Sequence, residues 1–167
     1  DHMNPTTQTS WVLPRRTAAH SGTAHLQMNR RPAWDGECSD DDFLRLTEAL
    51  RPYGGVLPVD DLRALCHVGN PGFGLSESIM RGEVFTLGWR RQAWVPCFQF
   101  MGANWTPCLR VFSITAEMRP AIEGEDLAIW FIEPSPWLYG STPLSLVFSE
   151  TERVRQAARI DRFAISH

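Results

Sequence analysis

The sequence contains no lysine, and all 16 of its basic residues are arginines. Either the base composition of the genome or a need for planar, bidentate contacts would account for this. It also has no apolar run close to the ~20 residues of a membrane-spanning helix, and no apolar signal-peptide core near its N-terminus. The net charge of −3 over 167 residues argues against a generally basic nucleic-acid coat protein, though not against a local basic patch. These features predict a cytoplasmic protein with one medium domain, or two small domains sharing a core.

The patterns that mark common active sites are missing as well. There is no GxSxG or HExxH motif, and the glycine-rich residues 69–74 do not have the spacing of a phosphate-binding loop. The four cysteines form no CxxC pair, which disfavours a zinc site and a disulfide framework. Cys66 and His67 are neighbours that point about 100° apart on a helix, so they do not indicate a catalytic pair. We expect no enzymatic activity, no cofactor and no metal.

Residues 1–37 are rich in Thr, Ser, Asn, Pro and Arg and show no hydrophobic period. They are predicted to form a flexible, mildly basic N-terminal arm. Its first three residues include a cloning remnant, with Met3 as the expected natural start.

Beyond the arm, apolar residues at helical spacing predict five helices. Their inward faces are formed by Phe43, Leu46 and Leu50; by Leu62, Leu65 and Cys66; by Val111, Ile114 and Met118; by Leu127, Trp130 and Phe131; and by Val154, Ala157 and Ala158. Ser39 has the spacing of an N-cap for the first of these helices, and Ser149 with Glu152 that of a capping box for the last. Thr142 followed by Pro143 is typical of another helix start. The last helix has arginines near its end, which would complement its dipole.

A β-hairpin is expected in the middle of the chain. Two runs rich in β-branched and aromatic residues, 83–89 and 93–100, are separated by Arg90, Arg91 and Gln92. Pro96 places the second strand at a sheet edge. The predicted fold class is therefore mainly α with a β-hairpin (α+β), a small helical bundle with a winged-helix-like segment.

The order of a helix at 59–67, a short helix at 76–81 and the hairpin is that of a winged helix-turn-helix, as in excisionase-like proteins. In that geometry the second helix enters the major groove and the hairpin tip reaches the DNA backbone. The residues that would contact DNA are Ser76, Ser78, Arg81, Arg90 and Arg91. A purely structural wing is the alternative, because residues 76–95 carry an excess of only one positive charge.

Two motifs resemble a known family. The pattern W-x-P-x-x-Q-F is formed by Trp94, Pro96, Gln99 and Phe100, and a second motif, PSPWLYGSTPLSL, occupies residues 134–146. Together they resemble the toxin-binding domain of Xre/MbcA/ParS antitoxins, the partners of RES-domain toxins, over about residues 84–160. Ser135 and Tyr139 stand where the family has asparagine and glycine. The usual N-terminal helix-turn-helix is missing, and residues 59–100 could take its place.

The resemblance implies a non-catalytic, antitoxin-like protein that captures a toxin, with residues 142–167 covering the toxin's nicotinamide-dinucleotide site. Residues 38–100 would form the winged-helix-like segment and residues 101–167 the helical toxin-binding domain. Structural roles are expected for Trp94, Pro96, Gln99, Phe100, Trp130, Pro134, Gly140 and Pro143. Partner contacts are expected from Trp137, Tyr139, Arg155, Arg159 and Arg162, with a core role for the two aromatics and solvation of the arginines as alternatives. A homodimer, a regulator of operator DNA and an orphan domain with another protein partner are further possibilities.

Overall fold

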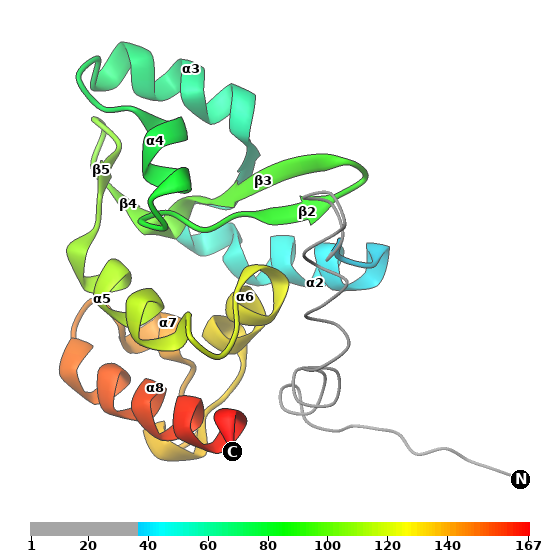
Figure 1. Cartoon of the computed structure of the whole chain (residues 1–167), viewed down its shortest axis with the longest axis vertical. Coiled ribbons are helices and arrows are strands. Elements are labelled where there is room, and N and C mark those ends of the chain that lie inside the picture. Colours follow the sequence, from blue (N-terminus) through cyan, green and yellow to red (C-terminus); the bar gives the residue numbers. More distant parts are fainter. Residues whose placement is uncertain (1–36) are drawn as a thin grey trace, which may run out of the picture.

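The computed structural model describes residues 37–167, so the predicted arm lies outside the described residues except for Glu37. The elements are α2 (Asp40–Leu50), η1 (Arg51–Tyr53), β1 (Val56–Pro58), α3 (Val59–Gly69), α4 (Leu75–Met80), β2 (Leu87–Trp89), β3 (Gln92–Pro96), η2 (Cys97–Gln99), β4 (Phe100–Met101), β5 (Thr106–Pro107), α5 (Leu109–Met118), α6 (Gly124–Ile132), η3 (Pro136–Leu138), α7 (Pro143–Leu146) and α8 (Thr151–Ser166). This mainly helical α+β architecture confirms the predicted fold class (Figure 1). None of the helices in the described part has the length and apolar character needed to cross a bilayer.

The larger sheet is antiparallel, with the strand order β1-β3-β2. Val56 pairs with Pro96, and Leu87 pairs with Trp94. The prediction that Pro96 marks an edge strand is wrong, because β3 is the central strand. Pro96 is tolerated there as the last residue of β3, where its missing N–H interrupts only the end of the ladder. β1 escaped prediction because three residues ending in Pro58 are too few to show an alternating pattern.

The segment from β1 through α3 and α4 to the β2–β3 hairpin follows the order of a winged helix, with β1 as the third strand. Arg90 and Arg91 form its tight turn, with φ of 50° and 61°. Positive φ at both central positions is what a two-residue hairpin turn requires. A second, very short hairpin, which was not predicted from the sequence, pairs β4 with β5.

The five predicted helical faces are buried, with one exception. Leu65 is 43% exposed and lies on the solvent side of α3, so its inward placement was wrong. Two predicted caps are present. Ser39 Oγ accepts a hydrogen bond from Asp42 N (3.1 Å), and Thr142 Oγ1 accepts one from Ser145 N (3.1 Å).

The start and end of α8 differ from the prediction. Its N-cap is Glu150, without a side-chain cap bond, so the expected capping box of Ser149 and Glu152 is wrong. The Thr151 hydroxyl donates instead to the carbonyl of Val147 (2.7 Å), which ties the helix start to the preceding turn. The helix continues to Ser166 and has no basic residue in its last turn. The expected match between its terminal arginines and the helix dipole is therefore absent.

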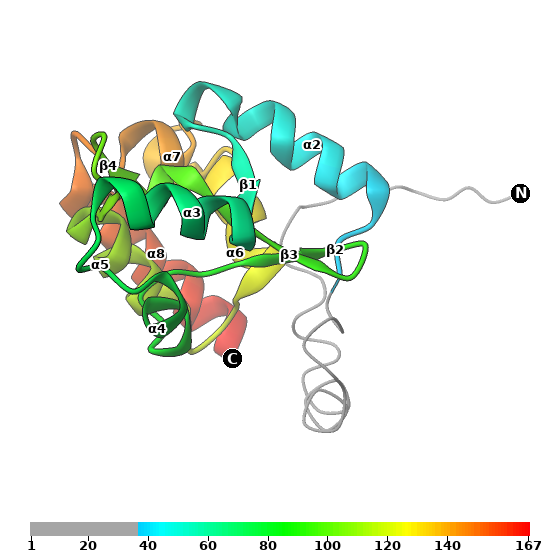
Figure 2. The ribbon, with the colours of Figure 1, turned by 90° about the horizontal axis from the view of Figure 1, so that it is seen from above.

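The main hydrophobic core joins α2, the sheet and the C-terminal helices, and it runs from Cys38 to Ala158. The two predicted segments, 38–100 and 101–167, therefore share one core. A smaller cluster lies between α3, α4 and the sheet and is formed by Leu62, Cys66, Leu75, Val84, Val95 and Phe100. In Figure 1, α3 lies at one end of the molecule and α8 at the other, and Figure 2 looks down this direction with α3 in front.

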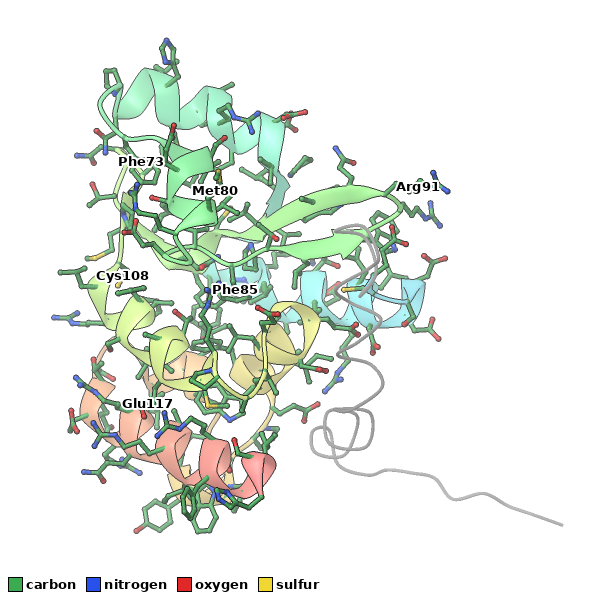
Figure 3. The ribbon with its side chains drawn as sticks, in the orientation of Figure 1. Phe73, Met80, Phe85, Arg91, Cys108 and Glu117 are labelled. Carbon is green, nitrogen blue, oxygen red and sulfur yellow. The ribbon has the colours of Figure 1, made fainter. Side chains whose placement is uncertain are left out.

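The motif glutamine Gln99 ties the sheet to the helices. It is 3% exposed, and its Oε1 accepts from Phe85 N (2.9 Å) while its Nε2 donates to the carbonyls of Phe85 (2.9 Å) and Pro96 (3.0 Å). This side chain pairs with the backbone of Phe85 much as a neighbouring strand would. Phe85 stacks on Phe131 of α6, with ring planes 7° apart, and lies between the sheet and the helical layer (Figure 3).

Candidate partner-binding surface

Residues 135–141, which include the tip of the second motif, are held by hydrogen bonds within the loop. Ser135 N donates to the Ser141 carbonyl (2.9 Å), and Gly140 N donates to the Ser135 carbonyl (2.9 Å). The Ser135 hydroxyl, in a residue that is 1% exposed, accepts from Trp137 N (3.2 Å). Ser135 thus caps the short helix η3. The loop is a fixed frame because its buried polar groups are bonded to one another.

Tyr139 lies at the tip of this frame. Its backbone is left-handed (φ 55°, ψ 38°), which costs a residue other than glycine roughly 1–2 kcal/mol. Its side chain is 90% exposed, and the guanidinium of Arg153 lies 5.5 Å from the ring centroid. The tyrosine therefore occupies a glycine-type backbone position and directs its ring to solvent. Burial cannot explain this arrangement.

Trp137 is held by a carboxylate that the sequence did not point to. Its Nε1 donates to Asp161 Oδ1 (2.8 Å), and the buried Trp130 donates to Asp161 Oδ2 at the same distance. Burial raises the pKa of Asp161, and the bonds from Trp130 and Trp137 act against that rise. Trp137 is 49% exposed, so one edge of its indole is fixed and the remainder faces solvent.

Two apolar residues of α8 extend this surface. Arg153 of α8 lies over the Tyr139 ring. Ile160 is two helical turns after Arg153 and on the same side of α8, and Phe163 is about one turn further along. Their side chains are 43% and 66% exposed. We call Trp137, Tyr139, Ile160 and Phe163 the aromatic face. Large apolar side chains left exposed on one side of a molecule are candidates for an interaction site. Ile160 and Phe163 could have been found in the sequence, because they fall off the inward face of the last helix.

The predicted arginines lie elsewhere on α8. Arg159 Nε is 3.3 Å from Glu117 Oε1, and Arg162 Nη2 is 3.3 Å from Glu117 Oε2. Figure 3 shows Glu117 between α5 and α8. Arg155 Nε is 3.4 Å from Glu152 Oε1. The structure therefore separates the predicted partner-binding set. Arg159 and Arg162 pair with Glu117 of α5 and Arg155 with Glu152 of α8 itself, whereas Trp137 and Tyr139 contact Asp161 and Arg153.

The remaining motif residues support the frame. Trp94 packs edge-on against Phe43 of α2, with centroids 5.1 Å apart. Pro134 is exposed two residues after the end of α6, and Pro143 is buried at the first position of α7. Gly140 has φ of 87°, the positive value expected there.

The predicted DNA-contacting residues of α4 are engaged within the protein. Ser78 is 1% exposed and donates to Glu83 Oε1 (3.0 Å), so its predicted contact with DNA is wrong. The Ser76 hydroxyl accepts from Arg63 Nη2 (3.1 Å). Arg81 Nε is 3.1 Å from Glu83 Oε2. Two of the six residues of α4, Leu75 and Ser78, are buried against the protein.

At the hairpin tip, Arg90 also has an acidic partner. Its Nη2 is 3.1 Å from Asp40 Oδ2, and its guanidinium lies over the Trp89 ring at 4.5 Å. Trp89 Nε1 also donates to Asp40 Oδ1 (2.8 Å). The hydrogen bond from Arg90, and after it the one from Trp89, lower the pKa of Asp40. The backbone N–H of Arg91 donates to Glu37, and its side chain extends from the tip (Figure 3).

Three of the four cysteines, Cys38, Cys66 and Cys97, do not have the character of nucleophiles. Cys66 is 1% exposed, and burial raises the pKa of its thiol. Burial also raises the pKa of Cys38 to about 12 and that of Cys97 to about 11. A reactive cysteine requires the opposite shift. Across residues 37–167, no three His, Cys, Asp or Glu side chains are grouped so that they could hold a metal ion.

Comparisons with protein families, with curated proteins and with solved structures find no match to this chain. Its function is therefore inferred from the motifs and from the geometry of the aromatic face.

Proposed function

We propose that the chain is a non-catalytic, cytoplasmic binding protein of antitoxin type that captures a partner protein through the aromatic face. The observation that carries the proposal is Tyr139, whose ring is 90% exposed on a left-handed backbone. A strained residue that buries almost nothing contributes little to folding, and strain of this kind is typical of functional sites. Tyrosine and tryptophan are also the residues most enriched among binding hot spots.

The rigidity of the face supports the same function. The loop is bonded within itself, and Trp137 is fixed at its indole nitrogen by Asp161. A surface that is ordered before binding loses less side-chain entropy when the partner arrives. By the motif resemblance, the partner would be a RES-domain toxin. The paired arginines of α8 would then lie at the border of the contact, with Arg153 beside Tyr139 closer to its centre.

The test is the dissociation constant for a RES-domain protein encoded beside this gene, measured by isothermal titration calorimetry. Trp137→Ala and Tyr139→Ala should each weaken binding by at least about 30-fold, the equivalent of a 2 kcal/mol hot spot. Leu109→Ala is the matched control, since Leu109 is 77% exposed on α5 and lies outside the aromatic face; it should change the affinity less than about 3-fold. If both aromatic variants fold and bind as tightly as the control, the aromatic face is not the interface. A chain that binds no RES-domain protein but another protein through this face would be an orphan domain of the same type.

A second candidate is a DNA-binding regulator, favoured by the winged-helix order of β1, α3, α4, β2 and β3. It would contact operator DNA through Arg91, because Arg81 and Arg90 have acidic partners. Fluorescence anisotropy with the chain's own promoter tests this. Arg91→Ala should lower the slope of log affinity against log salt by about 1. An unchanged slope would exclude contact by the hairpin tip. Light scattering of the same samples tests the proposed homodimer.

A further inference from the structure

Asp161 joins three elements that are distant in the sequence. It lies on α8 and accepts one hydrogen bond from Trp130 of α6 and one from Trp137 of η3, both at 2.8 Å. Each carboxylate oxygen receives one indole N–H. The next residue, Arg162, pairs with Glu117 instead. Burial raises the pKa of Asp161, and the hydrogen bonds from the two indoles, which lower it, offset only part of that rise.

The two indoles differ in what the loss of this bond would cost. Trp130 is 1% exposed, so water cannot replace the carboxylate as its acceptor. Trp137 is 49% exposed, and water can take the place of Asp161 there. A buried donor left without an acceptor is costly, whereas an exposed donor is not. When only one acceptor is left, Trp130 should keep it and Trp137 should be released.

We infer that Asp161 is a positioning residue for the aromatic face: it holds the Trp137 indole in one orientation and thereby sets the affinity of partner capture without touching the partner. The effect on affinity rests on the proposed function, whereas the hold on Trp137 does not. The ionised carboxylate offers each indole a charged acceptor oxygen. Protonation turns one of these oxygens into a neutral hydroxyl that accepts more weakly, and Asp161→Asn replaces one with an NH2 group that donates and would face an indole N–H.

The hold on Trp137 is measured by NMR on the full chain, with nitrogen-15 in the tryptophan indoles. The seven tryptophans give up to seven indole signals, and Trp137→Phe and Trp130→Phe assign the two of interest. On acidification through the pKa of Asp161, the Trp137 signal should move to the position of a solvated indole and its heteronuclear NOE should fall. The Trp130 signal should shift less and keep its NOE. This titration uses the unmodified chain, so it remains decisive even if a variant fails to fold.

Asp161→Asn should reproduce the acidic signal of Trp137 at neutral pH. The matched control is Glu117→Gln, which changes a carboxylate on α5 that pairs with α8 but contacts neither indole; it should leave the signal unchanged. If Asp161→Asn folds and leaves the Trp137 signal and NOE as in the unmodified chain, the inference is overturned, whatever the partner does. A Trp137 signal that does not titrate with Asp161 overturns it as well.

The effect on capture is measured with the same RES-domain protein. Asp161→Asn should weaken binding by about 2- to 10-fold, the factor expected for immobilising one side chain. It should cause no further loss in a Trp137→Ala background, because it acts through that residue. If Trp137→Ala weakens capture and Asp161→Asn does not, the positioning role is wrong and the proposed surface stands. If Trp137→Ala itself has no effect, the proposed surface fails, and the role of Asp161 in capture fails with it.

Discussion

Replacing Tyr139 by glycine and by alanine would separate the backbone strain at this residue from the use of its ring. Both changes remove the ring and its contact with Arg153, but only glycine adopts the left-handed backbone (φ 55°) without strain. Relief of the strain contributes about 1–2 kcal/mol, and the greater freedom of glycine in the unfolded chain takes back about 0.4–1 kcal/mol. Tyr139→Gly should therefore be more stable than Tyr139→Ala by roughly 0.5–1 kcal/mol.

Urea denaturation followed by circular dichroism measures this difference directly. In a thermal scan it corresponds to a Tm about 1–4 °C higher for the glycine variant at this chain length. Partner affinity should fall to the same low value in both variants, since neither has the ring. Equal stability of the two would refute the argument that Tyr139 is strained. A glycine variant that is more stable and still binds like the unmodified chain would mean that the strain serves something other than capture.

Two further changes test the hydrogen bonds of Gln99 and the protonation of Asp161. Gln99→Ala removes three hydrogen bonds to backbone groups of Phe85 and Pro96. It should lower the free energy of unfolding, measured by urea denaturation, by about 2–4 kcal/mol. A loss below about 1 kcal/mol would show that water replaces the amide. Burial raises the folded-state pKa of Asp161 above its ordinary value of 3.8. Between the ordinary and the folded-state pKa, the folded chain therefore holds more protons than the unfolded chain. This group consequently makes the free energy of unfolding fall as pH rises through that window. The unfolding free energies of the unmodified chain and of Asp161→Asn are compared from about pH 3.5 to 7, because asparagine does not titrate. The value for the unmodified chain minus that for Asp161→Asn should fall as pH rises, and a rise would contradict the argument.

Local patterns in the sequence predicted the features that local physics decides. The helical spacing of residues such as Val111, Ile114 and Met118 identified buried faces, because only one side of each helix meets the core. Ser39 and Thr142 identified helix starts, because their side chains cap N–H groups three residues away. The exposed aromatic residue at position 139 could also be selected, from the proline breaks around it.

Features that depend on distant partners could not be predicted in this way. The central position of β3 is decided by pairing with β1, some forty residues earlier in the chain. Asp161 carries no motif, and its two tryptophan partners are 24 and 31 residues away. The arginines of α8 looked available only because Glu117, on another helix, could not be placed beside them. Side chains that make such contacts are determined by the packing of elements and have no signature in the residues next to them.

The core that runs from α2 to α8 also determines when the chain can fold during synthesis. Phe43 and Leu46 of α2 belong to the same cluster as Leu127 and Val154, which leave the ribosome much later. At about 5–20 residues per second, α2 has to wait several seconds for α6 and α8. The apolar face of α2 remains exposed to proteases and chaperones throughout this interval. A protein built in this way completes its core only when almost all of the described chain has been made, so its supply of folded molecules depends on uninterrupted translation to near residue 158.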